Sequence, residues 1–315
     1  MKHGMYSPLF NPYLHHETER DKLYQKLYNL PGACHLDIPI ASFHARTSYP
    51  AFFFHTEDID RITERIRKLK KELDERWLEM TDRKREETLR RLMKKEIESS
   101  AALEGIECSE KELCLAEDAL REGKEPVPFS GIVKAYEQLI GGKEFSFDTC
   151  EDIRTFYNDF ILDDILRRDP ENRPDGYIFR KDGVEIAYGN KIRHKGTYPE
   201  ALIIEYTEKA LQLKNSSDWP LLIRLAAFLF LFGYIQPFYD GTGLTARFIA
   251  ACHIAREISP FAALSFSPVL LENKDYCFHL YENTCSTANR GCLTGFIVGF
   301  LEIMELASEK ALEEI

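Results

Sequence analysis

Hydrophobic side chains recur every three to four positions along most of the chain, which is the spacing that gathers them on one face of an α-helix. The pattern is clearest after Thr56, which supplies a helix cap and is followed by acids in the first turn. The apolar positions of this segment are Ile59, Ile62, Ile66, Leu69 and Leu73. We expect an amphipathic helix that ends near Met80, and, after a break at Thr81-Asp82, a second helix that continues to Ala101.

Helical spacing resumes along the rest of the chain. Ser109 and Glu112 have the spacing of a capping box, which predicts a helix that begins there and ends near Glu122. Further helices are predicted over residues 130–140, 147–166, 199–213, 219–235, 244–258, 273–286 and 295–312. The chain is therefore predicted to be mainly helical.

Two segments lack this spacing. Residues 1–55 carry many prolines and aromatics, and we expect them to form an extended arm laid over the remainder. Between Gly176 and Gly196, the runs 177–180 and 184–188 are rich in β-forming residues, and Asp182-Gly183 stands between them. This arrangement is typical of a β-hairpin, and it is the one hairpin that we predict.

These patterns predict an all-α (mainly α) fold, in which a helical bundle carries one β-hairpin and an N-terminal helical extension. We divide the chain into an extended arm (1–55), an N-terminal helical region (56–122) and a core (123–315).

The amino-acid composition argues against several classes of binding partner and location. The 315 residues include 41 basic and 52 acidic side chains, for a net charge of −11, so we expect neither nucleic acid nor an anionic membrane as a partner. The most apolar stretch, residues 221–235, is too short to span a bilayer, which needs about 20 apolar residues. The eight cysteines form no CxxC pair, which favours reduced thiols and a cytoplasmic location.

One segment has the residue types that bind phosphate, with the sequence Gln236-Pro237-Phe238-Tyr239-Asp240-Gly241-Thr242-Gly243-Leu244-Thr245-Ala246-Arg247. A helix is predicted to end before it and another to begin within it. Its two glycines allow a ligand to approach closely, and the free N–H groups of a helix N-terminus bind anions. Arg247, one turn further, could reach the same anion. A helix cap with two turn glycines and no phosphate is the alternative interpretation.

This segment resembles the Fic (Fido) motif, H-P-F-x-x-G-N-G-R-x-x-R, in register from Gln236 to Arg247. A second segment, Ser100-Ala101-Ala102-Leu103-Glu104-Gly105, resembles the inhibitory motif of the same family, S/T-x-x-x-E-G/N. The predicted hairpin lies upstream, where Fic proteins carry a flap that docks the target protein, here at Val184, Glu185 and Ile186. The resemblance covers residues 100–312 and implies a Fic-type bundle with its core at 123–315.

The resemblance implies a protein adenylyltransferase (AMPylator) that uses ATP with Mg²⁺. Asp240 would hold the metal ion. The phosphates would contact this aspartate together with Gly241, Thr242, Gly243 and Arg247.

Ser100, Glu104 and Gly105 would be the inhibitory residues, with Glu104 paired to Arg247 so that ATP is kept from its productive pose. The sequence gives a separate reason for this pair. Gly105 is a typical helix stop, and it leaves the Glu104 carboxylate at the negative end of the helix dipole, where a nearby cation is needed to compensate it. An exposed glutamate on a frayed turn is the alternative.

Three positions depart from the family motif. Gln236 replaces the histidine that acts as general base in active Fic enzymes, and an amide cannot take a proton; such a loss typically costs about 10²–10⁴ in rate. Thr242 replaces asparagine and Leu244 replaces an arginine that contacts phosphate, and a lost electrostatic contact often costs about 10²–10³. Catalysis by the family mechanism is therefore predicted to be impaired.

Three functions stay open at this point. The first is a catalytically impaired pseudoenzyme that binds a nucleotide or a protein target through the flap. The second is an active transferase that moves AMP or a related group to a protein hydroxyl by altered chemistry. The third is a helical interaction scaffold, and homodimerisation is compatible with all three. His194 is a candidate substitute base, although we expect a solvated loop histidine there, and we expect His253 in the core.

Overall fold

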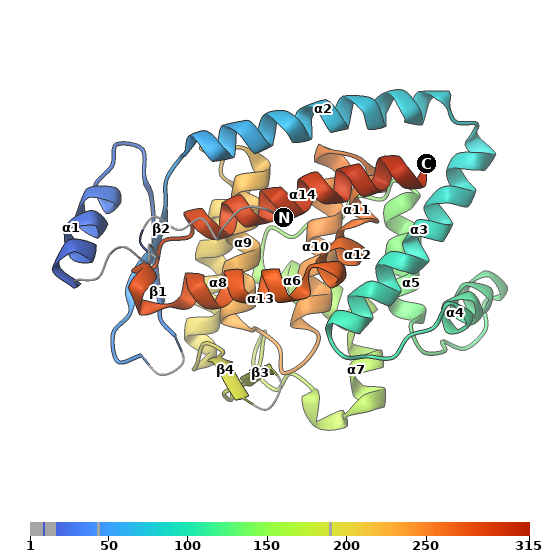
Figure 1. Cartoon of the computed structure of the whole chain (residues 1–315). Helices are drawn as coiled ribbons and strands as arrows, with labels where there is room; N and C mark the ends of the chain where they lie inside the picture. The colour runs from blue at the N-terminus through green and yellow to red at the C-terminus, as the bar shows by residue number, and fades with distance from the viewer. Residues whose placement is uncertain (1–8, 10–16, 43–44, 189–190) are drawn as a thin grey trace.

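The computed structural model describes residues 9, 17–42, 45–188 and 191–315, so residues 1–8 and 10–16 of the predicted arm lie outside the described residues. The fold is mainly helical, as predicted (Figure 1). Its helices are α1 (Glu17–Tyr28), α2 (Glu57–Glu79), α3 (Asp82–Leu103), α4 (Glu110–Glu122), α5 (Ser130–Ile140), α6 (Cys150–Phe160), α7 (Leu162–Arg168), α8 (Glu200–Asn215), α9 (Leu221–Ile235), α10 (Thr242–Glu257), α11 (Pro260–Ala263), α12 (Phe266–Glu272), α13 (Lys274–Cys285) and α14 (Thr294–Glu314). Two 3₁₀ turns span Pro170–Asn172 and Thr287–Asn289.

Helix α9 lies in the middle of the bundle, packed against α8, α10 and α14. Its sequence is apolar on every side, and a helix of that kind is stable only when it is surrounded by other elements. Phe228, Leu231 and Phe232 are fully buried. Because α9 leads directly into the segment that resembles the Fic motif, that segment starts from a rigid part of the core.

Helix α2 forms an outer layer that runs along α14 (Figure 1). It begins at the predicted cap, since the Thr56 side chain accepts a hydrogen bond from the N–H of Ile59. Its apolar stripe is buried, and Arg65 of α2 makes a two-pronged ion pair with Glu305 of α14. Helix α3 then turns away from α2 and carries the inhibitory motif toward α10.

The prediction of an extended N-terminal arm was wrong for the described part. Residues 17–28 form α1, and β1 (Cys34–Ile40) pairs with β2 (Tyr49–Phe53) as an antiparallel hairpin. Helix α1 has no fully buried residue, but Leu23, Tyr24, Leu27 and Tyr28 are partly buried against a small hydrophobic cluster that includes Phe52. Their spacing of four residues was present in the sequence. Strand β1 does alternate, with Leu36, Ile38 and Ile40 buried and the residues between them exposed, and that signal was present in the sequence.

The β-hairpin near the core exists, but its strands are not the predicted ones. Strand β3 (Glu185–Tyr188) pairs with β4 (Lys191–Lys195), across residues 189–190, which lie outside the description. Residues 177–180 form no strand. The reason is Arg180, whose buried guanidinium makes hydrogen bonds that fix this run against the loop after α9.

The predicted helix 147–166 is divided at Ile161 into α6 and α7. Within the described part of the chain, no helix has the length and apolar character that crossing a bilayer requires.

Candidate functional site

Aromatic side chains in the protein interior hold the loop between α9 and α10 in place. Phe238 is fully buried and stacks on Tyr157 of α6, with ring centroids 3.7 Å apart. The Tyr157 hydroxyl donates a hydrogen bond of 3.0 Å to the backbone carbonyl of Asp240. Gly241 follows with φ +80°, a conformation that favours glycine. The loop therefore enters α10 with a defined geometry.

Gln236 closes the C-terminal end of α9. It adopts φ 54° and ψ 68°, a left-handed conformation that is uncommon for a residue with a side chain. Its amide Nε2 donates to the carbonyl of Gly233 at 2.8 Å, so the side chain is engaged with its own helix. A neutral amide in this position caps the helix and has no basic nitrogen.

Arg180 holds this helix end and the base of the hairpin together, and sequence reasoning missed it. Its side chain is fully buried, and it donates to the carbonyls of Gln236 at 2.7 Å, Thr197 at 2.8 Å and Ile235 at 3.2 Å, and also to that of Asp182. Burial lowers the pKa of the guanidinium to about 10. The available signal was a lone arginine at the end of the apolar run 177–179.

The inhibitory segment ends α3 as predicted. Glu104 is the last half-helical residue and Gly105 has φ +71°. The N–H groups of Gly105 and Ile106 donate to the carbonyls of Ala102 and Ala101 at 3.0 Å each, which is the hydrogen-bond pattern of a Schellman motif. This turn fixes the direction in which the Glu104 side chain leaves the helix.

Glu104 and Arg247 form the predicted ion pair, with 2.8 Å between Oε1 and the guanidinium. Arg247 also donates from Nε to the Ser100 hydroxyl at 2.7 Å and from a terminal nitrogen to the Ser100 carbonyl at 2.9 Å. The two side chains are 24% and 12% exposed, so solvent screens the pair only in part. Glu104 as a whole residue is exposed, as in the alternative interpretation, but its turn is hydrogen-bonded and its carboxylate is paired, so the turn is not frayed.

The Glu104 carboxylate lies against the N-terminus of α10. A Cβ built on Gly243 would come within 2.0 Å of Glu104 Oε1. This helix end has no side-chain cap and no acidic residue in its first turn, so its N–H groups and dipole favour an anion. The Glu104 carboxylate is the anion that lies at this helix end in the structure.

Two other predicted ligand residues are already engaged. The carboxylate of Asp240 accepts from the N–H of Gly241 at 2.6 Å and lies 3.3 Å from the Arg168 guanidinium. Thr242 is buried, and its hydroxyl contacts the backbone of Phe238, accepting from that N–H at 3.3 Å. The threonine hydroxyl therefore faces into the loop.

Asp240, the predicted Mg²⁺ ligand, faces a cation of the protein itself. The cation that faces this carboxylate is Arg168, and the described residues contain no group of three or more potential metal-ligating side chains. Mg²⁺ is usually held by one or two carboxylates together with phosphate oxygens. Asp240 supplies one carboxylate, which Arg168 faces in this structure, and its role at a Mg²⁺ ion stays a prediction.

Glu96, two turns before Glu104 on α3, is fully buried and was not predicted as a site residue. It accepts hydrogen bonds from the N–H and hydroxyl of Ser267 on α12 and from the hydroxyl of Tyr136 on α5. Burial raises its pKa to about 7, against the opposing effect of these bonds and of the Arg247 charge. An acid on the apolar stripe between Met93 and Ile97 was the signal in the sequence.

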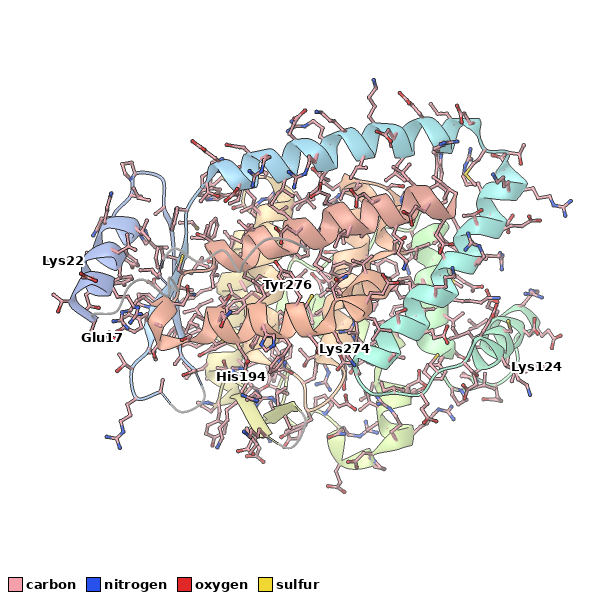
Figure 2. The ribbon with its side chains drawn as sticks, in the orientation of Figure 1. Glu17, Lys22, Lys124, His194, Lys274 and Tyr276 are labelled. Carbon is pink, nitrogen blue, oxygen red and sulfur yellow. The ribbon has the colours of Figure 1, made fainter. Side chains whose placement is uncertain are left out.

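The two candidate histidines are both in the protein interior. His194 lies on β4 beneath the bundle, and the expectation of a solvated loop residue was wrong (Figure 2). Its Nε2 donates to the carbonyl of Tyr234, and burial lowers its pKa. Burial also lowers the pKa of His253 to about 4. His194 has no contact with the α9–α10 loop beyond this link to the end of α9, which does not support it as a substitute base.

The flap residues lie beside the loop. The N–H of Gly196 donates to the carbonyl of Val184 at 3.0 Å, Glu185 pairs with Lys195 at 2.8 Å, and Ile186 is opposite His194. Ile192 of β4 is 39% exposed, which leaves an apolar side chain at the surface of the hairpin.

Comparisons with known proteins agree with this arrangement. Residues 149–254, which include the hairpin, α9 and the α9–α10 loop, match the model of the Fic/DOC family. Among solved structures, a Fic family protein from Desulfovibrio desulfuricans G20 is similar with a TM-score of 0.59 and 19% identity, over 82% of this chain and 75% of that chain. No curated protein matches the chain. Residues 149–254 of this chain are therefore a Fic domain.

Proposed function

We propose that this Fic-domain protein is a pseudoenzyme that binds a nucleotide at the N-terminus of α10 and a protein target through the β3–β4 flap, without efficient AMP transfer. The observation that carries the proposal is the position of the Glu104 carboxylate, against Gly243 and paired with Arg247. An anion from the chain itself thus takes the place that a phosphate would take. When Glu104 withdraws, the helix N-terminus and the Arg247 guanidinium become available to a phosphate group.

The second part of the proposal rests on Gln236. Its amide donates to the Gly233 carbonyl and has no basic nitrogen, so a hydroxyl placed there would keep its proton. Leu244 adds no charge to the loop, which leaves Arg247 and the helix dipole to stabilise phosphate. These groups support binding, whereas proton transfer from a target hydroxyl lacks a base.

Calorimetry with ATP and Mg²⁺ tests the binding step. We expect weak or no heat with the wild type and clear binding to Glu104→Ala, because the substitution removes the competing carboxylate. Glu98→Ala, an exposed glutamate on the same helix, is the matched control and should behave as the wild type. Absence of binding to Glu104→Ala, with the protein shown to be folded, would contradict the proposal.

Labelled ATP and a cell lysate test the transfer step. We expect no labelled protein with the wild type or with Glu104→Ala. Labelling that increases in Glu104→Ala would instead support the active transferase with altered chemistry. Nucleotide binding in calorimetry without labelling is the result that the pseudoenzyme predicts.

A further inference from the structure

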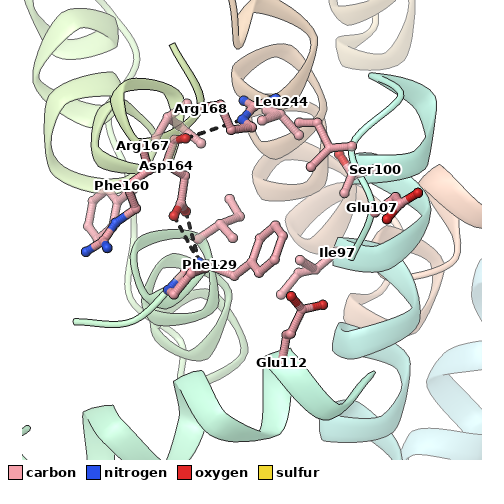
Figure 3. Close-up of a pocket in the computed structure, with 15 residues that line it drawn as sticks. Ile97, Ser100, Glu107, Glu112, Phe129, Phe160, Asp164, Arg167, Arg168 and Leu244 are labelled. Carbon is pink, nitrogen blue, oxygen red and sulfur yellow. Dashed lines mark hydrogen bonds between the residues drawn. The ribbon is translucent and has the colours of Figure 1, made fainter. Parts of the chain in front are cut away.

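A cavity of about 230 Å³ lies between α3, the loop before α5, the α6–α7 pair and the start of α10 (Figure 3). Most of its wall is apolar, and the principal side chains are Ile97, Ala101, Ile106, Phe129, Ile132 and Leu244. Of the described residues, the loop positions 240–243 and Arg247 do not line it. The cavity is therefore separate from the anion position at the N-terminus of α10.

The two arginines at the cavity wall already have partners. Arg168 donates to the backbone carbonyl of Asp164 at 3.3 Å and pairs with Asp240 (Figure 3). Arg167 donates to the carbonyl of Pro126 at 3.0 Å. The ion pair compensates the charge of Arg168, whereas Arg167 is exposed to solvent and makes a hydrogen bond to a backbone carbonyl.

Two acids at the wall, Asp164 and Glu112, are also engaged. Both oxygens of the Asp164 carboxylate accept from the N–H of Phe129, at 3.0 and 3.2 Å, and burial raises the pKa of Asp164. Glu112 accepts from the N–H of Ser109 at 2.9 Å in the capping box of α4. The remaining charged residues of the wall, Arg167 and Glu107, are exposed to solvent. An ionised occupant of the apolar interior would therefore lose hydration without gaining a buried partner.

We propose that this cavity binds a small, neutral and largely apolar molecule, either an aromatic ring system or a branched aliphatic compound with at most one hydrogen-bonding group. An apolar cavity of about 150 Å³ is large enough to take up benzene, so the present volume admits a slightly larger ring system such as indole. Filling such a space restores dispersion contacts that its walls otherwise lack. The Ser100 hydroxyl, also in the wall, has an oxygen that can accept one hydrogen bond from the ligand.

Occupancy would act on the neighbouring anion position through Ser100. This residue contributes to the cavity wall and also accepts a hydrogen bond from Arg247. A ligand packed against Ile97, Ser100 and Ala101 would stabilise the end of α3 in the position that keeps Glu104 on Arg247. The binding inference itself does not depend on nucleotide binding.

The experiment is a titration of the full chain with indole, followed by calorimetry and by thermal denaturation. We expect saturable binding that raises the melting temperature, and no comparable binding of indole-3-acetate, which has the same ring system and a charge. Ile106→Trp fills the cavity from a half-exposed turn position and Leu244→Phe fills it from α10. Each is expected to weaken indole binding about tenfold or more, since a filled pocket rejects a ligand by roughly that factor.

Leu115→Trp on α4 is the matched control, because Leu115 is 52% exposed and does not line the cavity. It should bind indole as the wild type does. The inference is overturned if indole fails to bind the wild type up to its solubility limit. It is also overturned if folded Ile106→Trp and Leu244→Phe bind indole with wild-type affinity, or if indole-3-acetate binds equally well.

Discussion

Glu104 and Arg247 are 143 positions apart in the sequence, and their side chains meet at 2.8 Å across the glycine turn that begins α10. The contact joins the C-terminal end of α3, which resembles the inhibitory motif, to the loop of the Fic domain. It is supported on one side by the Schellman turn at Gly105 and on the other by two hydrogen bonds from Arg247 to Ser100. The pair is therefore part of the structure of the site.

The first prediction concerns the energy of this pair. Arg247→Ala should lower the free energy of unfolding by about 3 kcal/mol, because Ser100 and Glu104 lose a charged donor in a partly buried position. A double-mutant cycle with Glu104→Ala should give a coupling energy of about 1–3 kcal/mol. Urea denaturation of the wild type, both single variants and the double variant measures it.

The control for this cycle is the ion pair between Arg83 and Glu87, which are 2.8 Å apart. The Arg83 side chain is 89% exposed and the Glu87 side chain is 63% exposed. Exposed pairs of this kind contribute about 0.3–0.5 kcal/mol. If the Glu104–Arg247 coupling is no larger than that of the control, the pair has no special structural role.

The second prediction concerns Gly241. Its φ of +80° disfavours any side chain, and a Cβ there would lie 3.0 Å from Ile161 and 3.1 Å from Tyr157. Gly241→Ala should lower the free energy of unfolding by about 2–4 kcal/mol, through backbone strain of about 1–2 kcal/mol and additional crowding of about 1–2 kcal/mol. Gly142 has a φ of +85° and open space around it, so Gly142→Ala should show the strain alone. Equal losses in both variants, measured by urea denaturation, would mean that the loop is not packed as described.

The third prediction is a pH dependence caused by Glu96. Its folded pKa of about 7 lies above the ordinary value of 4.5, so between these pH values the native state holds a proton that the unfolded state has released. The free energy of unfolding should therefore fall by up to about 3 kcal/mol as the pH rises from about 5 to about 7. Glu96 should change it little above about pH 7. The groups that face Glu96 are Tyr136, Ser267 and Arg247.

Glu96→Gln isolates this contribution. The amide keeps the shape of the side chain and can bond both hydroxyls, but it does not titrate. Denaturation curves across this pH range should show a smaller decline for Glu96→Gln than for the wild type, whereas Glu98→Gln on the exposed side of α3 should follow the wild type. Parallel curves for Glu96→Gln and the wild type would show that the carboxyl is not protonated in the native state.

Local signals in the sequence were sufficient to predict most helices. The caps at Thr56 and Ser109 and the stop at Gly105 each depend on a few neighbouring residues, and so they can be predicted from short segments. The Glu104–Arg247 pair followed from the family resemblance together with the dipole argument at the end of α3.

The features that could not be predicted depend on contacts between distant segments. Asp182-Gly183 is a common hairpin turn, but Arg180 makes hydrogen bonds to the end of α9. These bonds hold residues 177–180 beside α9, so that they do not form a strand. Asp240 faces Arg168, which is 72 positions away in the sequence, and no short segment indicates that contact. The burial of His194 likewise depends on Tyr234 and Tyr281 from two other helices.

The last prediction restores the residues that the family motif would have. We expect Gln236→His, Thr242→Asn and Leu244→Arg, combined with Glu104→Ala, to label a protein target with AMP from labelled ATP. The rate should exceed that of the same variant with glutamine kept at 236 by about 10²–10⁴, the usual contribution of a general base. The arginine at 244 would border an apolar cavity, so a loss of about 1–3 kcal/mol in the free energy of unfolding should accompany the gain. A folded variant that binds ATP and still labels no protein would contradict the view that these motif positions account for the missing transfer activity. The ion pair between Arg168 and Asp240 would then be the next contact to remove by substitution.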